Sequence, residues 1–122
     1  MNWIPWVIFA VVLVLVMAYR RTSQIATRAA QELLAQGARV IDVRTPAEFA
    51  AEHLPQASSL PLEQITRRVR EEIPDRSTVL LLHCQSGVRS GLAVQRLKSL
   101  GYAQTHNLGS FSRAKKIVEG LR

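Results

Sequence analysis

Apolar residues recur along most of this chain with helical or strand spacing, after an N-terminal stretch that is apolar throughout. Residues 3–19 carry no charge and are apolar apart from the tip of Tyr19. Beyond them, three- and four-residue spacings indicate amphipathic helices, and short continuous apolar runs indicate buried strands. We predict helices at residues 22–37, 46–53, 62–73, 90–102 and 112–121 and strands at residues 38–43, 58–62, 78–84 and 105–109. Strands that alternate with helices predict an open α/β parallel sheet flanked by helices.

Capping residues mark where several of these helices begin and end. Ser23 is expected to cap the first amphipathic helix, and Gly37 suits the left-handed residue after its end. Thr45 and Glu48 have the spacing of a capping box, with Pro46 at the first helical position. These signals predict a short helix directly after the first strand.

The N-terminal apolar stretch is long enough to consider as a membrane anchor. Its 17 residues, 3–19, form a helix of about 25 Å, slightly less than a bilayer core of about 30 Å. Trp3, Trp6 and Tyr19 lie at its ends, where aromatic rings favour the membrane interface. A cleaved signal peptide would need preceding positive charge and a cleavage site, and a buried core helix fits less well because β-branched residues occur on every face. We therefore expect one transmembrane helix at residues 3–19, followed by a domain at residues 22–122.

The distribution of charge predicts the orientation of this anchor. The first charged residues, Arg20 and Arg21, directly follow the apolar stretch, and no charge precedes it. The positive-inside rule therefore predicts a single-pass protein with its N-terminus outside, its domain in the cytoplasm, and membrane lipid as a partner. One cysteine permits no internal disulfide, which agrees with a reducing compartment.

The net charge of +7 does not indicate a nucleic-acid partner. Nucleic-acid binding modules combine basic groups with aromatic stacking platforms. Of the aromatic residues, only Phe49, Tyr102 and Phe111 lie outside the N-terminal stretch, and none of them is interleaved with a basic cluster. We expect the basic groups at residues 67–70 and 113–116 to form solvated faces or to lie against anionic lipid headgroups.

The only cysteine lies at the carboxyl end of a predicted strand, where open α/β sheets bind their ligands. Cys84 ends the strongest predicted strand, in the stretch VLLLHCQSGVRSG, and a helix with Ser90 as its N-cap is expected after the loop. Gly87 lets the connecting loop curl so that its amides point inward, and Arg89 adds a positive charge. Such a loop favours a thiolate and predicts a nucleophile, although an isolated cysteine is commonly a buried, inert residue. No metal site is expected, because one cysteine and three scattered histidines offer no ligand spacing.

Three segments of the chain, residues 40–62, 80–90 and 101–110, resemble a single-domain rhodanese in order and spacing. This family consists of thiosulfate or persulfide sulfurtransferases, and the likeness covers about residues 22–122. Its active loop is usually C-R-x-G-x-R-S/T, which Cys84, Gly87, Arg89 and Ser90 match. The resemblance implies a rhodanese-like sheet, catalysis by Cys84, no cofactor, and substrate binding by the amides and side chains of the loop residues Gln85, Ser86, Gly87, Val88, Arg89 and Ser90.

Further family signatures point to supporting residues. Asp42 and Arg44 match the family's D-V-R at a strand end, where they are expected to brace the loop or pair with Arg89, or to form an ordinary structural ion pair. Glu48 and His53 match its helix signature, Glu48 mainly as a capping residue and His53 as a pocket or surface residue.

Three departures from the family pattern concern the mouth of the site. Gln85 replaces a frequent arginine, which removes one positive charge and is expected to weaken thiosulfate binding. Gln56 replaces a common glycine, and residues 109–111 differ from the usual Gly-Gly and following aromatics.

Sulfur and phosphate chemistry remain competing interpretations of this loop. The rhodanese fold resembles dual-specificity phosphatases with an H-C-x5-R signature, but only four residues separate Cys84 from Arg89. The shorter loop favours a persulfide over a phosphate group. We expect a double displacement in which Cys84 takes sulfane sulfur from thiosulfate or a persulfide and passes it to a thiol or a sulfur-carrier acceptor. A non-catalytic binding module at the membrane and a cysteine-dependent phosphatase are the alternatives.

Overall fold

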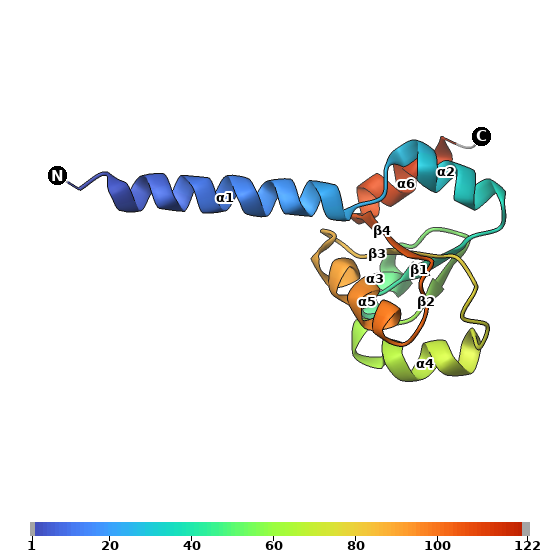
Figure 1. Ribbon diagram of the computed structural model, residues 1–122. Helices are drawn as coiled ribbons and strands as arrows, with labels where there is room; N and C mark the ends of the chain where they lie inside the picture. The colour runs from blue at the N-terminus through green and yellow to red at the C-terminus, as the bar shows by residue number, and fades with distance from the viewer. Residues whose placement is uncertain (1, 121–122) are drawn as a thin grey trace.

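Four short parallel strands form one sheet in the computed structural model, which describes residues 2–120 (Figure 1). In spatial order they are β2 (Ala57–Ser59), β1 (Arg39–Asp42), β3 (Leu80–His83) and β4 (Thr105–Gly109). The helices are α1 (Ile4–Ser23), α2 (Thr27–Ala35), α3 (Pro46–Ala51), α4 (Ile65–Glu72), α5 (Val88–Ser99) and α6 (Phe111–Glu119), with the 3-10 helix η1 (Leu62–Gln64) before α4. The predicted α/β sheet is thus confirmed.

Helices cover the two faces of the sheet and enclose a core on each. On one face α2 and α6 pack over Val40, Leu81 and Leu108. On the other, α4 and α5 cover Ile41 and neighbouring strand residues (Figure 1). Successive residues of a strand point to opposite faces, so the continuous apolar run of β3 supplies both cores at once.

Several predicted helix boundaries need correction. Ser23 does not cap α2: α1 continues through Ser23, and α2 begins at Thr27 with Ala26 as its N-cap. Ser90 does not cap α5, which already begins at Val88 after Gly87. The helix predicted over residues 62–73 is divided into η1 and α4, and the last helix spans Phe111–Glu119, with residue 121 outside the described residues.

The capping box is confirmed and begins α3. The Thr45 hydroxyl accepts a hydrogen bond from the Glu48 amide, while the Glu48 carboxylate accepts one from the Thr45 amide. These two bonds satisfy amides that the first turn of a helix leaves free. They also hold the Glu48 side chain at the N-terminus of α3.

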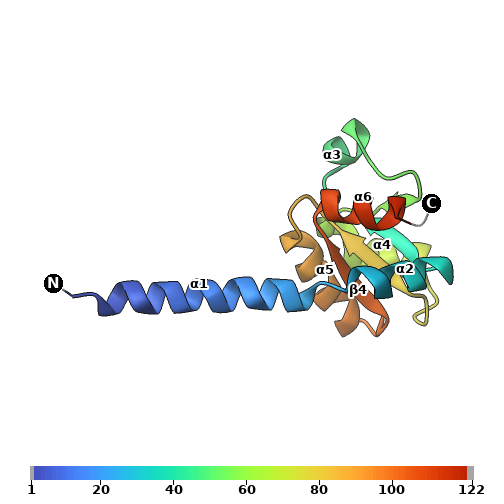
Figure 2. The same ribbon diagram turned by 90° about the horizontal axis from the view of Figure 1, so that it is seen from above.

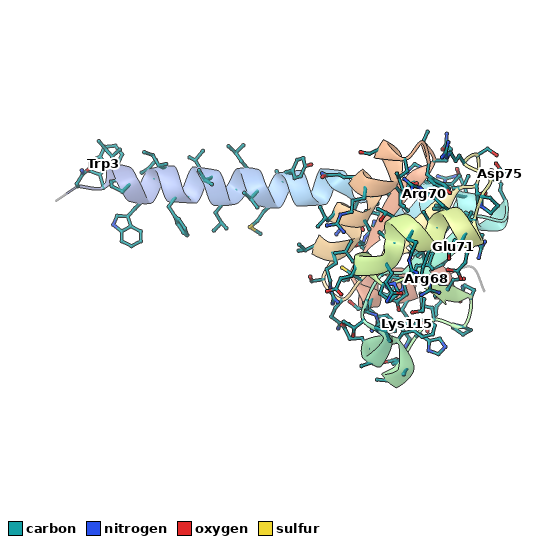
Figure 3. The ribbon with its side chains drawn as sticks, turned by 90° about the horizontal axis from the view of Figure 1, so that it is seen from below. Trp3, Arg68, Arg70, Glu71, Asp75 and Lys115 are labelled. Atoms are coloured by element: carbon teal, nitrogen blue, oxygen red, sulfur yellow. The ribbon has the colours of Figure 1, made fainter. Side chains whose placement is uncertain are left out.

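Helix α1 projects away from the sheet and its covering helices (Figures 1 and 2). Its apolar side chains extend outward on all sides (Figure 3), and Trp3 and Trp6 are 67% and 74% exposed. Among the helices in the described part of the chain, none is both long enough and apolar enough to cross a membrane. The transmembrane helix predicted at residues 3–19 is therefore not found, although the stretch is helical as expected.

The connection from α1 to the domain lies beside β4. Gln24 forms a parallel bridge with Asn107, and the Ile25 amide donates to the Asn107 carbonyl at 2.9 Å. The connection therefore extends the sheet next to the strand that borders the cysteine loop.

Candidate active site

The Cys84 loop lies at the carboxyl end of β3, between that strand and α5. The ends of β1 and β4 flank it, because parallel strands finish at the same edge of the sheet. The Cys84 amide donates to the Gly109 carbonyl of β4, and the Val43 amide after β1 donates to the His83 carbonyl. Residues from three strand ends therefore meet around one thiol.

The Cys84 side chain is buried, and hydrogen-bond donors point at its sulfur. The Gly87 amide is 2.9 Å from Sγ, and the Ser90 hydroxyl oxygen is 3.4 Å from it. Burial raises the pKa of the thiol, but hydrogen bonds from the hydroxyl and amide of Ser90, then from the amides of Gly87 and Ser86, outweigh it and leave the pKa of Cys84 below its usual value. This ring of donors favours a thiolate and argues against an inert core cysteine.

Gly87 makes the tight curl of the loop possible. Its φ of +95° lies in the left-handed region, which costs other residues conformational energy. A Cβ atom at this position would also lie 3.3 Å from the Gly109 Cα. A side chain here would push the loop away from β4. The absence of a side chain therefore lets the loop pack against β4 with the Gly87 amide directed at the cysteine sulfur.

Asn107 organises the loop from behind, a role that the sequence analysis missed. Its Oδ1 accepts hydrogen bonds from the Ser90 hydroxyl at 2.7 Å and the Gly109 amide at 2.8 Å. Its Nδ2 donates to the Gly87 carbonyl at 3.2 Å. The available signal was an amide side chain within a strand that is otherwise mostly buried, since buried polar groups require partners.

Ser90 connects this asparagine to the sulfur. It lies in the first turn of α5 with its side chain buried, between Asn107 Oδ1 and Cys84 Sγ. A hydroxyl carries one proton, so Ser90 donates to only one of these acceptors at a time. A charged sulfur attracts that proton more strongly, which couples ionisation of Cys84 to the Ser90–Asn107 bond.

Asp42 and Arg44 form a buried ion pair with each other, and the alternative pairing with Arg89 is not found among the described contacts. The Arg44 Nε and Nη2 atoms donate to the Asp42 carboxylate, the shortest distance being 2.7 Å. Arg44 also donates to the Glu52 carbonyl at 2.6 Å and to Gln85 Oε1 at 3.3 Å, and its guanidinium lies 4.6 Å from the Phe111 ring centre. This pair thus ties the segment after α3 to the first residue of the loop after Cys84.

The partner of Arg89 is Glu48. Arg89 Nη1 and Nη2 donate to Glu48 Oε1 and Oε2 at 2.7 and 3.0 Å, a two-pronged pair across 41 residues of sequence. The hydrogen bond from Arg89 is the main reason that the pKa of Glu48 falls to about 2, with bonds from Thr45 acting in the same direction. Glu48 is therefore both the capping residue we predicted and the counter-ion of the loop arginine.

The two histidines near the site have structural contacts. The exposed His53 ring stacks on Phe49 at 3.9 Å between centres, and its Nδ1 is 2.7 Å from the Phe49 carbonyl oxygen. His83 is buried at the end of β3, and burial lowers its pKa although Asp42 opposes this effect. In the contacts described for this region, His53 is bound to α3 and is not brought to the cysteine sulfur.

Two exposed residues of α5 form an apolar part of the rim of the site. Val88 and Leu92, on the first turns of α5, are 52% and 43% exposed. Ser86 forms a bridge with Ser110 at the end of β4. The loop is therefore held on its inner side by polar contacts, while part of its outer side presents apolar side chains to solvent.

Known proteins share this arrangement. Residues 26–116 match the sequence profile described as "Rhodanese-like domain". The thiosulfate sulfurtransferase PspE of Escherichia coli is 33% identical over 69 residues, which cover 57% of this chain and 66% of that protein. The uncharacterized protein YqhL of Bacillus subtilis is 35% identical over 117 residues, which cover 92% of this chain and 91% of that protein.

Solved structures agree with the sequence relatives. The human single-domain sulfurtransferase TSTD1 matches with a TM-score of 0.66 and 28% identity, covering 77% of this chain and 96% of that structure. A rhodanese from Escherichia coli, solved with anions, matches with a TM-score of 0.61 and 30% identity, covering 63% and 91%. The named relatives support sulfur transfer at the level of the family. With its parallel sheet and its cysteine loop at the carboxyl edge, this chain belongs to the rhodanese-like domain family.

Proposed function

We propose that this protein is a sulfurtransferase that carries sulfane sulfur as a persulfide on Cys84. The observation on which this proposal depends is the Gly87 amide, 2.9 Å from the Cys84 sulfur, at the centre of a ring of donors. Donors placed in this way stabilise negative charge on Cys84, and they would stabilise the same charge after one more sulfur has been added. Relatives named as sulfurtransferases support the same chemistry.

The first half-reaction loads the enzyme. The Cys84 thiolate attacks the sulfane sulfur of thiosulfate or a persulfide, a new S–S bond forms, and the bond between that sulfur and the rest of the donor breaks. Its electron pair leaves with sulfite or with a thiol. The amides of Ser86, Gly87 and Ser90, which lower the pKa of Cys84, are in place to bind the persulfide anion.

The second half-reaction returns the enzyme to its starting state. A thiophilic acceptor, such as a thiol, a sulfur-carrier protein or cyanide, attacks the outer sulfur of the Cys84 persulfide. The bond between the two sulfurs breaks, and the electron pair returns to Cys84 as a thiolate. Neither half-reaction requires a redox cofactor, because the sulfur moves without net electron transfer.

Mass spectrometry tests this proposal directly. After incubation with thiosulfate or a small persulfide, the intact protein is expected to gain the mass of one sulfur atom, and cyanide is expected to remove it as thiocyanate. Cys84→Ser removes the nucleophile, so both signals are expected to disappear. A wild-type protein that gains no sulfur from any donor would contradict the proposal. Cys84-dependent hydrolysis of an aryl phosphate would support the phosphatase alternative instead.

We also propose that α1 holds the domain at the cytoplasmic side of a lipid membrane. The exposed apolar side chains along α1 favour its insertion into a lipid surface. Tryptophans near one end and arginines near the other support this placement. The full-length protein is expected to float with phospholipid vesicles in a density gradient, whereas Leu13→Asp, which places a charge in the middle of α1, is expected to reduce flotation. Equal flotation of both proteins would contradict this proposal.

A further inference from the structure

Three cations around the Cys84 loop are each paired with a carboxylate. Arg44, with a side chain only 4% exposed, is paired with the fully buried Asp42. Arg89, the arginine of the loop itself, is paired with Glu48. Further out, Lys115 of α6 lies 3.5 Å from the Glu52 carboxylate. None of these three residues therefore offers an unpaired positive charge to an anionic substrate.

The pair between Arg89 and Glu48 is held in place from both sides. Both terminal nitrogens of the Arg89 guanidinium bind the two carboxylate oxygens. Glu48 Oε1 is in turn held by the amide and the hydroxyl of Thr45, at 3.1 Å each. The capping box of α3 therefore holds the Glu48 carboxylate in position to bind Arg89. The fold itself thus neutralises the charge of Arg89.

Gln85 adds no charge to the mouth. Its side-chain oxygen accepts a hydrogen bond from Arg44, which fills one of the remaining donor positions of that guanidinium. The two ion pairs together carry zero net charge, and an ionised Cys84 adds one negative charge. Arg113, the cation beside Gly109, is turned to the Leu108 and Ile25 carbonyls, to which it donates. Thiosulfate carries two negative charges, so its approach is opposed unless a free cation compensates them.

From this arrangement we infer that Glu48 is a specificity-determining residue, which disfavours thiosulfate and favours persulfide donors with at most one negative charge. The inference rests on the proposed sulfurtransferase function. Arg89 lies in the first turn of α5, directly after the Cys84 loop, so a change in its neutralisation alters the charge at the mouth of the site. The donor class selected is a hydropersulfide, R–S–SH, borne by a small thiol or by a protein cysteine.

The chemical step with such a donor is balanced without a co-reactant. The Cys84 thiolate attacks the outer sulfur of R–S–SH and forms the new S–S bond, while the S–S bond of the donor breaks. The electron pair leaves on R–S, which takes the proton from the transferred sulfur. The products are the Cys84 persulfide anion and the thiol R–SH.

Glu48→Gln tests the inference, because glutamine keeps a side-chain oxygen for the capping contacts and removes the charge. Sulfur loading is measured with two donors, thiosulfate and the hydropersulfide of 2-mercaptoethanol. For thiosulfate, kcat/KM is expected to rise about 3- to 10-fold, since a dianion gains most from an unpaired Arg89. For the hydropersulfide, kcat/KM is expected to change less than about 2-fold, and the gain with thiosulfate is expected to shrink at high salt.

Three further variants complete the experiment. Glu72→Gln is the control variant, because it changes the net charge of the protein as much as Glu48→Gln does. It breaks the i,i+4 ion pair with Arg68 on α4 and is expected to leave the donor preference unchanged. Glu48→Asp keeps the charge and is expected to retain the preference of the wild type. Gln85→Lys adds a cation at the mouth without touching Glu48 and is expected to raise thiosulfate use, which keeps the test available if Glu48→Gln does not fold.

The outcomes separate the inference from the function on which it rests. If neither donor loads the wild-type protein, the proposed function fails. If both donors load it but neither Glu48→Gln nor Gln85→Lys changes their ratio, the role of Glu48 is wrong. An equal shift in Glu72→Gln would also overturn the inference, because the effect would then come from net charge alone.

Discussion

The ion pairs Asp42–Arg44 and Glu48–Arg89 flank the same cysteine loop but have different surroundings. The first is almost completely buried, and Arg44 makes further bonds to the chain after α3 and to Gln85. The second lies at the rim, where the side chains of Arg89 and Glu48 are 34% and 31% exposed. A buried pair is costly to break because one charge is left without water or a partner, whereas a partly exposed pair is screened by solvent. We therefore expect the buried Asp42–Arg44 pair to contribute more to stability, and the partly exposed Glu48–Arg89 pair to contribute more to the charge at the mouth of the site.

Asp42→Asn should have the largest effect, because it leaves the buried Arg44 without its counter-charge. Loss of one partner of a buried ion pair costs about 3–5 kcal/mol of unfolding free energy. Urea unfolding followed by circular dichroism measures this change. A loss below about 1 kcal/mol would show that Arg44 finds compensation elsewhere and that the two pairs differ less than their burial indicates.

Asn107→Ala should have the next largest effect. It leaves the Gly109 amide and the Gly87 carbonyl without their hydrogen-bond partner, and buried unsatisfied groups cost about 1–3 kcal/mol each. We expect a loss of about 2–3 kcal/mol in unfolding free energy. Urea unfolding measures this change, and a loss below about 1 kcal/mol would contradict the role of the Asn107 side chain.

Ser90→Ala should affect reactivity more than stability. The serine side chain is the strongest of the groups that lower the pKa of Cys84 against the effect of burial, so its removal is expected to raise that pKa. The midpoint of the pH profile for alkylation by iodoacetamide should move to higher pH. At pH 7, alkylation is expected to slow about 5-fold, the effect of a hydrogen bond worth about 1 kcal/mol. Ser99→Ala, an exposed position on the same helix, is the control and should leave the profile unchanged.

Glu48→Gln should have the smallest effect on stability, below about 1 kcal/mol, because its ion pair is partly exposed. The pKa of Glu48 is lowered to about 2, so its contribution is complete above the usual carboxyl range and is lost as pH falls towards 2. The difference in unfolding free energy between wild type and variant is expected to stay constant between pH 5 and 8, and to decrease below about pH 4.5. A difference that varies between pH 5 and 8 would show that another group titrates with the pair.

The local elements of this protein could be predicted because they depend on neighbours in sequence. The continuous apolar run of β3, the capping box of α3 and the glycine turn after Cys84 all use contacts within a few residues. The same local reasoning predicted a helix at the N-terminus, and that helix is present. Its assignment as a transmembrane span is not supported, because no helix in the described part of the chain is long and apolar enough to cross a membrane.

The order of strands and helices, the position of Cys84 at a strand end and the glycine in its loop could all be predicted from the sequence. The contacts of Glu48 with Arg89, of Asn107 with the loop and of Ser90 with the sulfur could not. These partners come from different strand ends, which meet at one edge because the parallel sheet has formed. No spacing along the chain shows which charged and polar groups will share that edge.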